Sequence, residues 1–145
     1  MNELKQFPVH HEQKVIWGDM DALGHLNNVI YYRYIESARV TYFEALGLFD
    51  YDVSIVVAKS SCNYLSSVVY PDTLIIGSRV EEIRQSAIRM SYALYSQQQN
   101  KVVATGEAVL VCINQTTQLK APLPEKLKTE ILNLEAKANH QPILI

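Results

Sequence analysis

Two aspartates, a histidine and two asparagines lie close together in the run GDMDALGHLNN, residues 18–28. A helical pattern follows directly, so Asn27 is predicted to be the N-cap, with its side-chain oxygen accepting from a backbone N–H of the first turn. The backbone amide of Asn28 would then point outward at the positive end of the helix dipole, where it can stabilise an oxyanion. Asp21 lies seven residues upstream on the incoming loop. A carboxylate beside an oxyanion donor predicts acyl-transfer chemistry.

The other polar residues of this run also have structural interpretations. Aspartates in a loop before a helix commonly act in turns, and this role is predicted for Asp19. His25 either hydrogen-bonds the loop backbone or takes part in the site, and both interpretations stay open.

Two other kinds of site have a similar residue pattern, and both are rejected. A calcium loop also has acids at its first and third positions and glycine at its sixth, but it needs a bidentate glutamate at its twelfth. This chain has Leu23 at the fifth position and Ile30 at the twelfth. Phosphoryl-transfer hydrolases with Asp-x-Asp need a parallel sheet, which the short connections of this chain exclude. The sequence also lacks GxSxG, Walker, GxGxxG and HExxH motifs.

Composition predicts one globular domain spanning residues 1–145. Hydrophobic residues make up 48% and charged residues 19%, which excludes disorder as the main state, and glycine and proline number only five each. A net charge of -2 gives no electrostatic reason to expect a nucleic-acid partner. No run resembles a signal peptide or a membrane span. Cys62 and Cys112 lack CxxC spacing, so we expect reduced thiols and a cytoplasmic location.

One long helix is predicted over residues 28–46. Its apolar face is expected to comprise Tyr31, Tyr34, Ile35, Ala38, Tyr42 and Ala45. Much of its remaining surface is also apolar, so the helix should be wrapped by other elements. Gly47 is the expected C-cap. Arg39, three residues after Glu36, is expected to form an ion pair on the helix.

The rest of the chain is predicted to be mostly strands. The expected strands are residues 11–17, 53–58 with 62–70, 73–83, 87–96 and 102–113. Pro122 and Pro124 should open a short last helix with an apolar stripe at Leu127, Ile131 and Leu134. Short connections require antiparallel neighbours. The fold class is therefore α+β, a curved antiparallel sheet wrapped around the long helix, with the order of the strands left open.

The run WGDMDALGHLNNVIYYRYIESAR, residues 17–39, resembles the motif of the 4-hydroxybenzoyl-CoA thioesterase family of the hot-dog superfamily. It is most similar to the fatty acyl-CoA branch, with D-x-D-x-x-x-H-x-N-N followed by Y-x-x-Y/F-x-E-x-A-R. The likeness extends from about residue 10 to residue 127. It implies a hot-dog fold, assembly into homodimers or homotetramers, and hydrolysis of acyl-CoA to free acid and CoA without metal or organic cofactor.

The resemblance also implies roles for particular residues. Asp21 corresponds to the catalytic carboxylate, as nucleophile or general base, and the amide of Asn28 to the group that polarises the carbonyl. His25 corresponds to a functional histidine of plant acyl-carrier-protein thioesterases, although these carry asparagine where this chain has Leu23. Cationic side chains on the outer strands are the candidates for binding the CoA nucleotide, and here these are Lys59, Arg84 and Arg89. Glu36 is interpreted as structural, because no HGG motif precedes the helix.

The leading hypothesis is hydrolysis of a medium- or long-chain fatty acyl-CoA. The alternatives are a non-catalytic acyl-CoA sensor and a thioesterase acting on acyl-ACP or aroyl-CoA. The aliphatic residues Leu23, Leu26 and Ile30 lie near the expected site and favour an alkyl chain.

Overall fold

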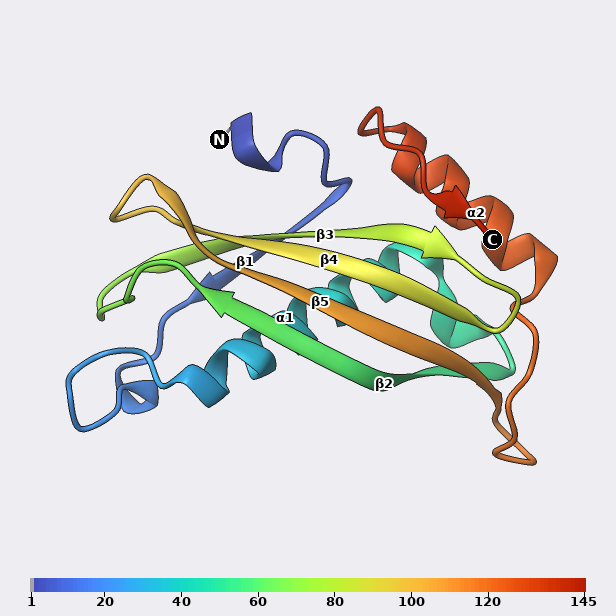
Figure 1. Ribbon diagram of the computed structural model, residues 1–145, viewed down its shortest axis with the longest axis horizontal. Coiled ribbons are helices and arrows are strands. Elements are labelled where there is room, and N and C mark those ends of the chain that lie inside the picture. Colours follow the sequence, from blue (N-terminus) through green and yellow to red (C-terminus); the bar gives the residue numbers. More distant parts are fainter. Residues whose placement is uncertain (1) are drawn as a thin grey trace.

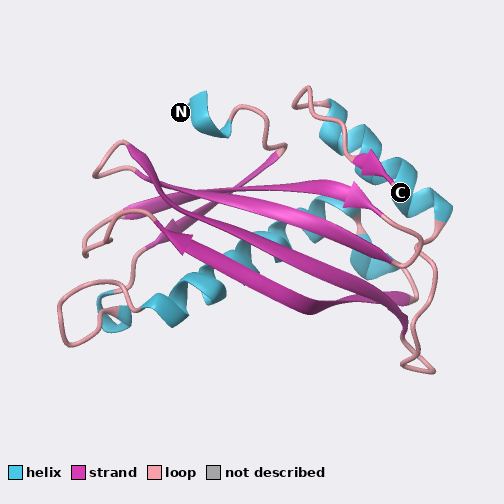
Figure 2. Ribbon diagram, in the orientation of Figure 1, coloured by secondary structure: helices cyan, strands magenta, loops and turns pink. Residues whose placement is uncertain are grey.

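The computed structural model describes residues 2–145. Two α-helices and six strands form the frame of the molecule (Figures 1 and 2). In chain order these are β1 (Val9–Lys14), α1 (Asn28–Leu46), β2 (Val53–Tyr64), β3 (Thr73–Ile83), β4 (Ala87–Ser96), β5 (Lys101–Asn114), α2 (Glu125–Ala136) and β6 (Ile143–Leu144). Short 3-10 turns occupy Asn2–Leu4, Trp17–Asp19 and Leu48–Asp50. Among the described residues no helix is long and apolar enough to cross a membrane.

The strands form one sheet in the order β1-β3-β4-β5-β2, and all neighbours on this path are antiparallel. The short strand β6 adds to β3 in parallel. The sheet curves around α1, which lies against one face and crosses its strands obliquely (Figure 1). The predicted antiparallel sheet around a long helix is therefore confirmed.

The ends of α1 confirm the capping predictions. The side chain of Asn27 accepts from the backbone N–H of Val29 at 3.0 Å, and Gly47 ends the helix at φ 66, in the left-handed region. The buried face of the helix differs in part from the prediction. Ala45 is exposed, whereas Phe43 and Leu46 are buried in the core.

Two further expectations were wrong in detail. The first strand ends at Lys14, and Trp17 lies in a 3-10 turn instead of a strand. The strand β2 runs without a break from Val53 but ends at Tyr64, so residues 65–70 form a loop. Because β2 pairs with β5 and not with β3, this loop crosses from one side of the sheet to the other.

The expected ion pair on α1 is also absent from the described residues. Arg39 is buried, its guanidinium lies 5.8 Å from the ring centroid of Tyr92, and Nη1 donates to the Tyr92 hydroxyl at 2.9 Å. The guanidinium therefore connects the helix to β4 instead of bridging to Glu36.

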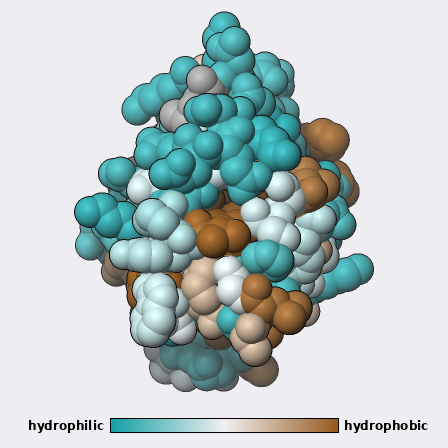
Figure 3. Space-filling model, turned by 90° about the vertical axis from the view of Figure 1, so that its left-hand side faces the viewer, coloured by the Kyte–Doolittle hydropathy of each residue, from teal (hydrophilic) through white to brown (hydrophobic). Residues whose placement is uncertain are grey.

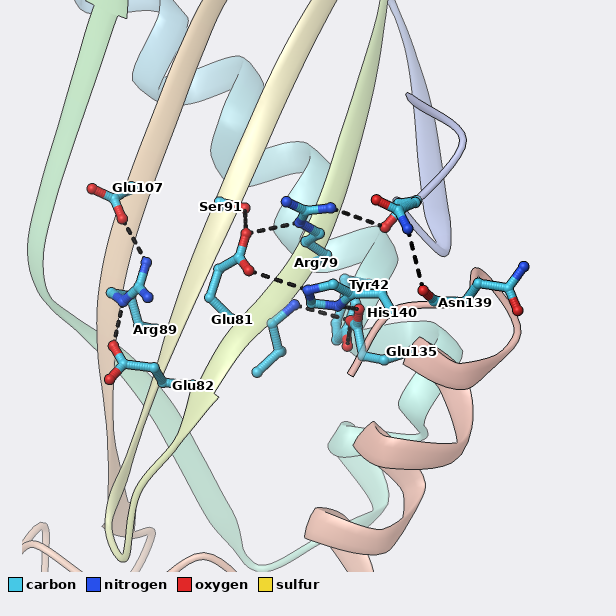
Figure 4. Close-up of polar contacts among 12 residues, drawn as sticks. Tyr42, Arg79, Glu81, Glu82, Arg89, Ser91, Glu107, Glu135, Asn139 and His140 are labelled. Carbon is cyan, nitrogen blue, oxygen red and sulfur yellow. Dashed lines mark hydrogen bonds and ion pairs between the residues drawn. The ribbon is translucent and has the colours of Figure 1, made fainter. Parts of the chain in front are cut away.

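A buried carboxylate joins α1, α2 and β3 at the end of the molecule opposite the loop of residues 15–27 (Figures 1 and 4). Glu135 is fully buried, and its Oε2 accepts from the Tyr42 hydroxyl at 2.5 Å and from the Val80 N–H at 2.9 Å. Its Oε1 lies 2.7 Å from Nδ1 of His140. This site was not predicted, although Glu135 occupies the position one helical turn after Ile131 where the stripe calls for an apolar residue.

The imidazole of His140 continues this network onto the outer face of the sheet (Figure 4). Its Nε2 lies 3.2 Å from Oε1 of Glu81. The other oxygen of Glu81 accepts from Arg79 Nε at 2.7 Å and from the Ser91 hydroxyl at 2.5 Å. Partial burial raises the pKa of Glu81, but the hydrogen bonds from Ser91 and Arg79 outweigh it and lower the pKa overall.

Candidate active site

The loop between β1 and α1 folds back on itself as a small hairpin. Met20 and Leu26 form an antiparallel bridge, and the N–H of Asp21 donates to the carbonyl of His25 at 2.7 Å. Gly24 closes the tip at φ 81, a conformation that few residues other than glycine adopt, and its N–H donates to the carbonyl of Asp21 at 3.0 Å. The backbone of this tip is therefore held in one conformation by its own hydrogen bonds.

Asp21 has one carboxylate oxygen held and one without a partner among the described residues. Oδ1 accepts from the backbone N–H of Leu23 at 2.9 Å and from that of His25 at 3.2 Å. These two contacts fix the side chain across the hairpin, as an Asx turn does. Oδ2 remains available for chemistry on the half-buried side chain.

The amide of Asn28 is the unsatisfied donor at the start of α1. The N–H of Val29 is capped by Asn27, and the N–H of Ile30 donates to the carbonyl of Asn27 at 2.9 Å. Within residues 2–145 the N–H of Asn28 has no protein acceptor. It thus combines a free donor with the positive end of a 19-residue helix.

One hollow of about 290 Å³ brings the three predicted catalytic residues together. Its lining includes Asp21, His25 and Asn28 from the loop and helix, and Tyr64, Ser66 and Ser67 from the end of β2 and the loop after it. The side chain of His25 is exposed and makes no hydrogen bond within the described part of the chain, whereas its backbone N–H and carbonyl both bind Asp21. The His25 side chain therefore does not hydrogen-bond the loop backbone, which was one of the two interpretations, and its part in the chemistry stays a prediction.

Tyr64 is a member of this hollow that the sequence did not single out. Its hydroxyl donates to the carbonyl of Asn28 at 2.8 Å, and its ring packs edge-on against Tyr31 with 4.8 Å between centroids. Burial, followed by the neighbouring Cys62 and Tyr32, raises the pKa of Tyr64 to about 12, so the hydroxyl stays protonated and keeps donating. Only the pairing of β2 with β5 brings this tyrosine to the helix start, so no local pattern could have indicated it.

Asp19 is structural, but its side chain bonds Tyr34 of α1 instead of forming the predicted turn contact. Its Oδ2 accepts from the Tyr34 hydroxyl at 2.6 Å, and its carbonyl accepts from the N–H of Asn27 at 3.0 Å. Burial and the hydrogen bond to Asp19 raise the pKa of Tyr34 to about 12. Asp19 therefore anchors the base of the hairpin to α1.

Asp19→Asn should lower stability and leave the chemistry nearly intact. Asparagine can still accept from Tyr34, but the charge-assisted hydrogen bond becomes neutral, which costs about 1 kcal/mol. For a chain of this size that corresponds to a melting temperature lowered by roughly 3 °C. Thermal unfolding followed by circular dichroism checks this. An unchanged melting temperature combined with lost turnover would contradict it.

The three predicted cationic residues share a second hollow of about 410 Å³ on the outer face of the sheet. Two of these cations already have carboxylate partners. Arg89 pairs with both Glu82 and Glu107, and Arg84 reaches Glu82 at 3.3 Å. Figure 4 shows Arg89 between its two partners. Lys59 makes no ion pair with any described residue, so a phosphate in this hollow would meet one free cation and two that are shared.

The aliphatic residues expected near the site lie in different environments. Leu26 is buried in the core, Ile30 packs against that core, and Leu23 is 81% exposed at the tip of the hairpin. Of the three, only Leu26 lines the hollow beside Asn28, so Leu23 and Ile30 give no support for an alkyl chain there. Among the described residues no group of three or more His, Cys, Asp or Glu side chains is arranged to hold a metal ion.

This fold, with a carboxylate held beside the N-terminus of the wrapped helix, defines a hot-dog thioesterase domain. Residues 15–131 match the model of the Thioesterase-like superfamily, and the chain belongs to this superfamily.

Two solved structures and one curated relative align over most of the chain. A thioesterase from Thermus thermophilus, solved with coenzyme A and Zn, is 32% identical with a TM-score of 0.79, and the match covers 90% of this chain and 97% of that one. The PA5185 protein of Pseudomonas aeruginosa is 28% identical with a TM-score of 0.80, covering 90% and 94%. The long-chain acyl-CoA thioesterase FadM of Escherichia coli is 28% identical over 117 residues, which cover 75% of this chain and 89% of FadM.

Proposed function

We propose that this protein hydrolyses acyl-CoA thioesters, and that its substrates are medium- or long-chain fatty acyl-CoAs. The observation that carries the proposal is the pairing of Asp21 and Asn28 in one hollow. One oxygen of the carboxylate is fixed and the other is free, and the nearby amide has no acceptor. The similarity to FadM and to a thioesterase solved with coenzyme A supports CoA as the carrier.

In the proposed reaction the thioester carbonyl oxygen accepts a hydrogen bond from the N–H of Asn28. This contact strengthens as negative charge develops on the oxygen, so it stabilises the transition state more than the bound substrate. Oδ2 of Asp21 then attacks the carbonyl carbon, the carbon–sulfur bond breaks, and the CoA thiolate leaves and takes up a proton. Water hydrolyses the resulting mixed anhydride, which releases the acid and restores the carboxylate.

In the alternative course Asp21 removes a proton from water, and this water attacks the carbonyl directly. His25 lines the same hollow and could orient either water. Rapid mixing separates the two courses, because accumulation of an acyl-enzyme gives a burst of thiol ahead of free acid. Equal release of thiol and acid from the first turnover would favour the general base.

Hydrolysis of CoA esters is tested by thiol release, followed with a disulfide dye over saturated acyl-CoAs of different chain lengths. Benzoyl-CoA and an acyl-ACP serve as parallel substrates. We expect turnover on the longer fatty acyl-CoAs. Tight binding of acyl-CoA without turnover of any ester would instead identify a sensor.

We further propose that the protein forms a homodimer, which can associate into a tetramer, through the free edge of β2. Among residues 2–145 this strand of 12 residues pairs only with β5, and the half-exposed Val56 and Val57 lie next to its free edge. Long apolar edge strands invite pairing with another chain. A two-fold axis along this edge would place a second copy beside Tyr64, and so beside the hollow that holds Asp21.

Val57→Lys should separate the copies, because a charge on the edge opposes strand pairing. We expect the variant to run as a monomer in light scattering coupled to gel filtration. It should also lose most of its kcat/KM, since the hollow would lack one wall. The control is Ile143→Lys, an exposed residue of β6 that pairs with β3 away from β2, which should leave the assembly and the turnover unchanged. A wild-type protein that is monomeric and fully active would contradict the proposal.

A further inference from the structure

A third hollow, distinct from the cationic one, borders Asp21 on the side away from Asn28. It measures about 470 Å³, and the larger apolar side chains of its lining are Trp17, Met20, Val69 and Tyr70. Asp21 is the residue that this hollow shares with the one containing Asn28. The carboxylate therefore stands at the boundary of two spaces.

The apolar side chains of this third hollow are unusually exposed. Trp17 is 74% exposed, Val69 49% and Tyr70 46%, and they come from two segments about fifty residues apart. Figure 3 views the molecule from this end and shows apolar and weakly polar residues gathered in its centre and lower part, below a region of hydrophilic residues. A cluster of exposed apolar groups beside a reactive carboxylate marks a binding site for an apolar ligand.

The two hollows differ in chemistry. The one beside Asn28 also presents the Tyr64 ring and the hydroxyl groups of Ser66 and Ser67. The one beside Trp17 presents mainly rings, a thioether and aliphatic carbon. An acyl-CoA has the same polarity about its thioester, with alkyl carbon on one side of the carbonyl and the amide-containing arm of CoA on the other.

We propose that the alkyl chain of the substrate lies in the hollow of Trp17, Met20, Val69 and Tyr70, and that these residues determine chain-length preference. This rests on the proposed hydrolase function. The thioester then lies between Asp21 and Asn28, and the amide arm enters the polar hollow toward β2. Lys59 lies five residues before Tyr64 along this strand, roughly 16 Å away, so the cationic hollow lies beyond the polar one.

Chain-length dependence follows from the burial of methylene groups. Each CH₂ that leaves water for the Trp17 hollow should raise kcat/KM up to about fourfold, until the hollow is filled. Trp17→Ala combined with Tyr70→Ala removes two walls. We expect at least a tenfold loss of kcat/KM on dodecanoyl-CoA and less than a twofold loss on butyryl-CoA. Phe49→Ala is the control, because the exposure of Phe49, at 64%, lies between those of Trp17 and Tyr70, but it lies after the far end of α1.

The outcomes separate the two proposals. Turnover that is equal for all chain lengths in the wild type, or an equal loss on both esters in the double variant, would overturn the assignment of the alkyl chain and leave the hydrolase intact. Absence of turnover on every ester would reject the hydrolase, and the assignment with it.

A direct probe of the hollow is available because Trp17 is the sole tryptophan of the chain. Because Trp17 is exposed, its fluorescence emission is predicted to be that of an indole in contact with water. S-dodecyl-CoA, a thioether that cannot be hydrolysed, should shift this emission to shorter wavelength, whereas CoA alone should not. Binding of the thioether seen by calorimetry without a change in emission would overturn the assignment.

Discussion

Asp21→Asn should reduce kcat by about 100- to 10,000-fold, the range expected when a general base or nucleophile is lost. The folded state should be nearly unaffected, for a reason specific to this loop. Oδ1 of Asp21 accepts from the N–H groups of Leu23 and His25, and the asparagine oxygen can accept both hydrogen bonds. The melting temperature should therefore stay within about 3 °C of the wild type, which corresponds to less than ~1 kcal/mol.

Two variants make this result specific. Asp19→Asn applies the same chemical change two residues away and should keep most of the turnover. Asp21→Ala removes the acceptor as well as the charge, so it should lower both kcat and the melting temperature. Retention of more than about a tenth of wild-type kcat in Asp21→Asn would remove this carboxylate from the mechanism. Steady-state thiol release and thermal unfolding provide the two measurements.

The parts of the site that could be predicted are those determined within a few residues. The cap at Asn27 and the free amide of Asn28 both depend on local rules for helix starts. Gly24 and Gly47 take the left-handed conformations that end a hairpin tip and a helix. A single sequence contains this information because the interacting groups lie close along the chain.

The parts that were missed depend on strand order. Short connections fixed which strands are antiparallel, but not that β2 crosses to pair with β5. That crossing places Tyr64 beside Asn28 and the loop holding Tyr70 beside Trp17. The burial of Arg39 has the same origin, because its hydrogen-bond partner Tyr92 lies on a strand 53 residues later.

Glu135→Leu should be the most destabilising of these substitutions. Leucine fills a similar volume but accepts no hydrogen bond, so the Tyr42 hydroxyl and the Val80 N–H would remain buried without partners. Each unsatisfied donor costs about 1–3 kcal/mol. We expect a total loss of roughly 3 kcal/mol and a melting temperature lowered by about 10 °C. The kcat of the folded variant should stay near wild type, because α2 and the Asp21 loop lie at opposite ends of the molecule (Figure 1).

Glu135→Gln is the matched variant, and it should separate hydrogen bonding from charge. Its amide oxygen can accept from Tyr42 and Val80, and its NH₂ group can donate to Nδ1 of His140, which leaves Nε2 free to donate to Glu81. The wild type has carboxylate oxygens at both ring nitrogens, whereas a neutral imidazole has one N–H. The network therefore needs one additional proton, on the imidazole or on Glu135, and glutamine removes this need.

The two proteins should consequently respond differently to pH. Burial raises the pKa of Glu135, although its hydrogen bonds to Tyr42, Val80 and His140 oppose the shift. The folded wild type thus binds a proton more tightly than the unfolded chain, and this contribution to stability is full below about pH 4.3 and is lost as pH rises through the raised pKa. The pKa of Glu81 is lowered, so this residue has the opposite effect and stability is lost as pH falls. The hydrogen bonds from Ser91 and Arg79 that lower the pKa are present in both proteins, so this effect cancels in their difference. The melting temperature of Glu135→Gln should therefore increase relative to that of the wild type as pH rises from 4 to 8. A constant difference over this range would contradict this prediction, because the folded wild type would then bind a proton at Glu135 no more tightly than the unfolded chain does.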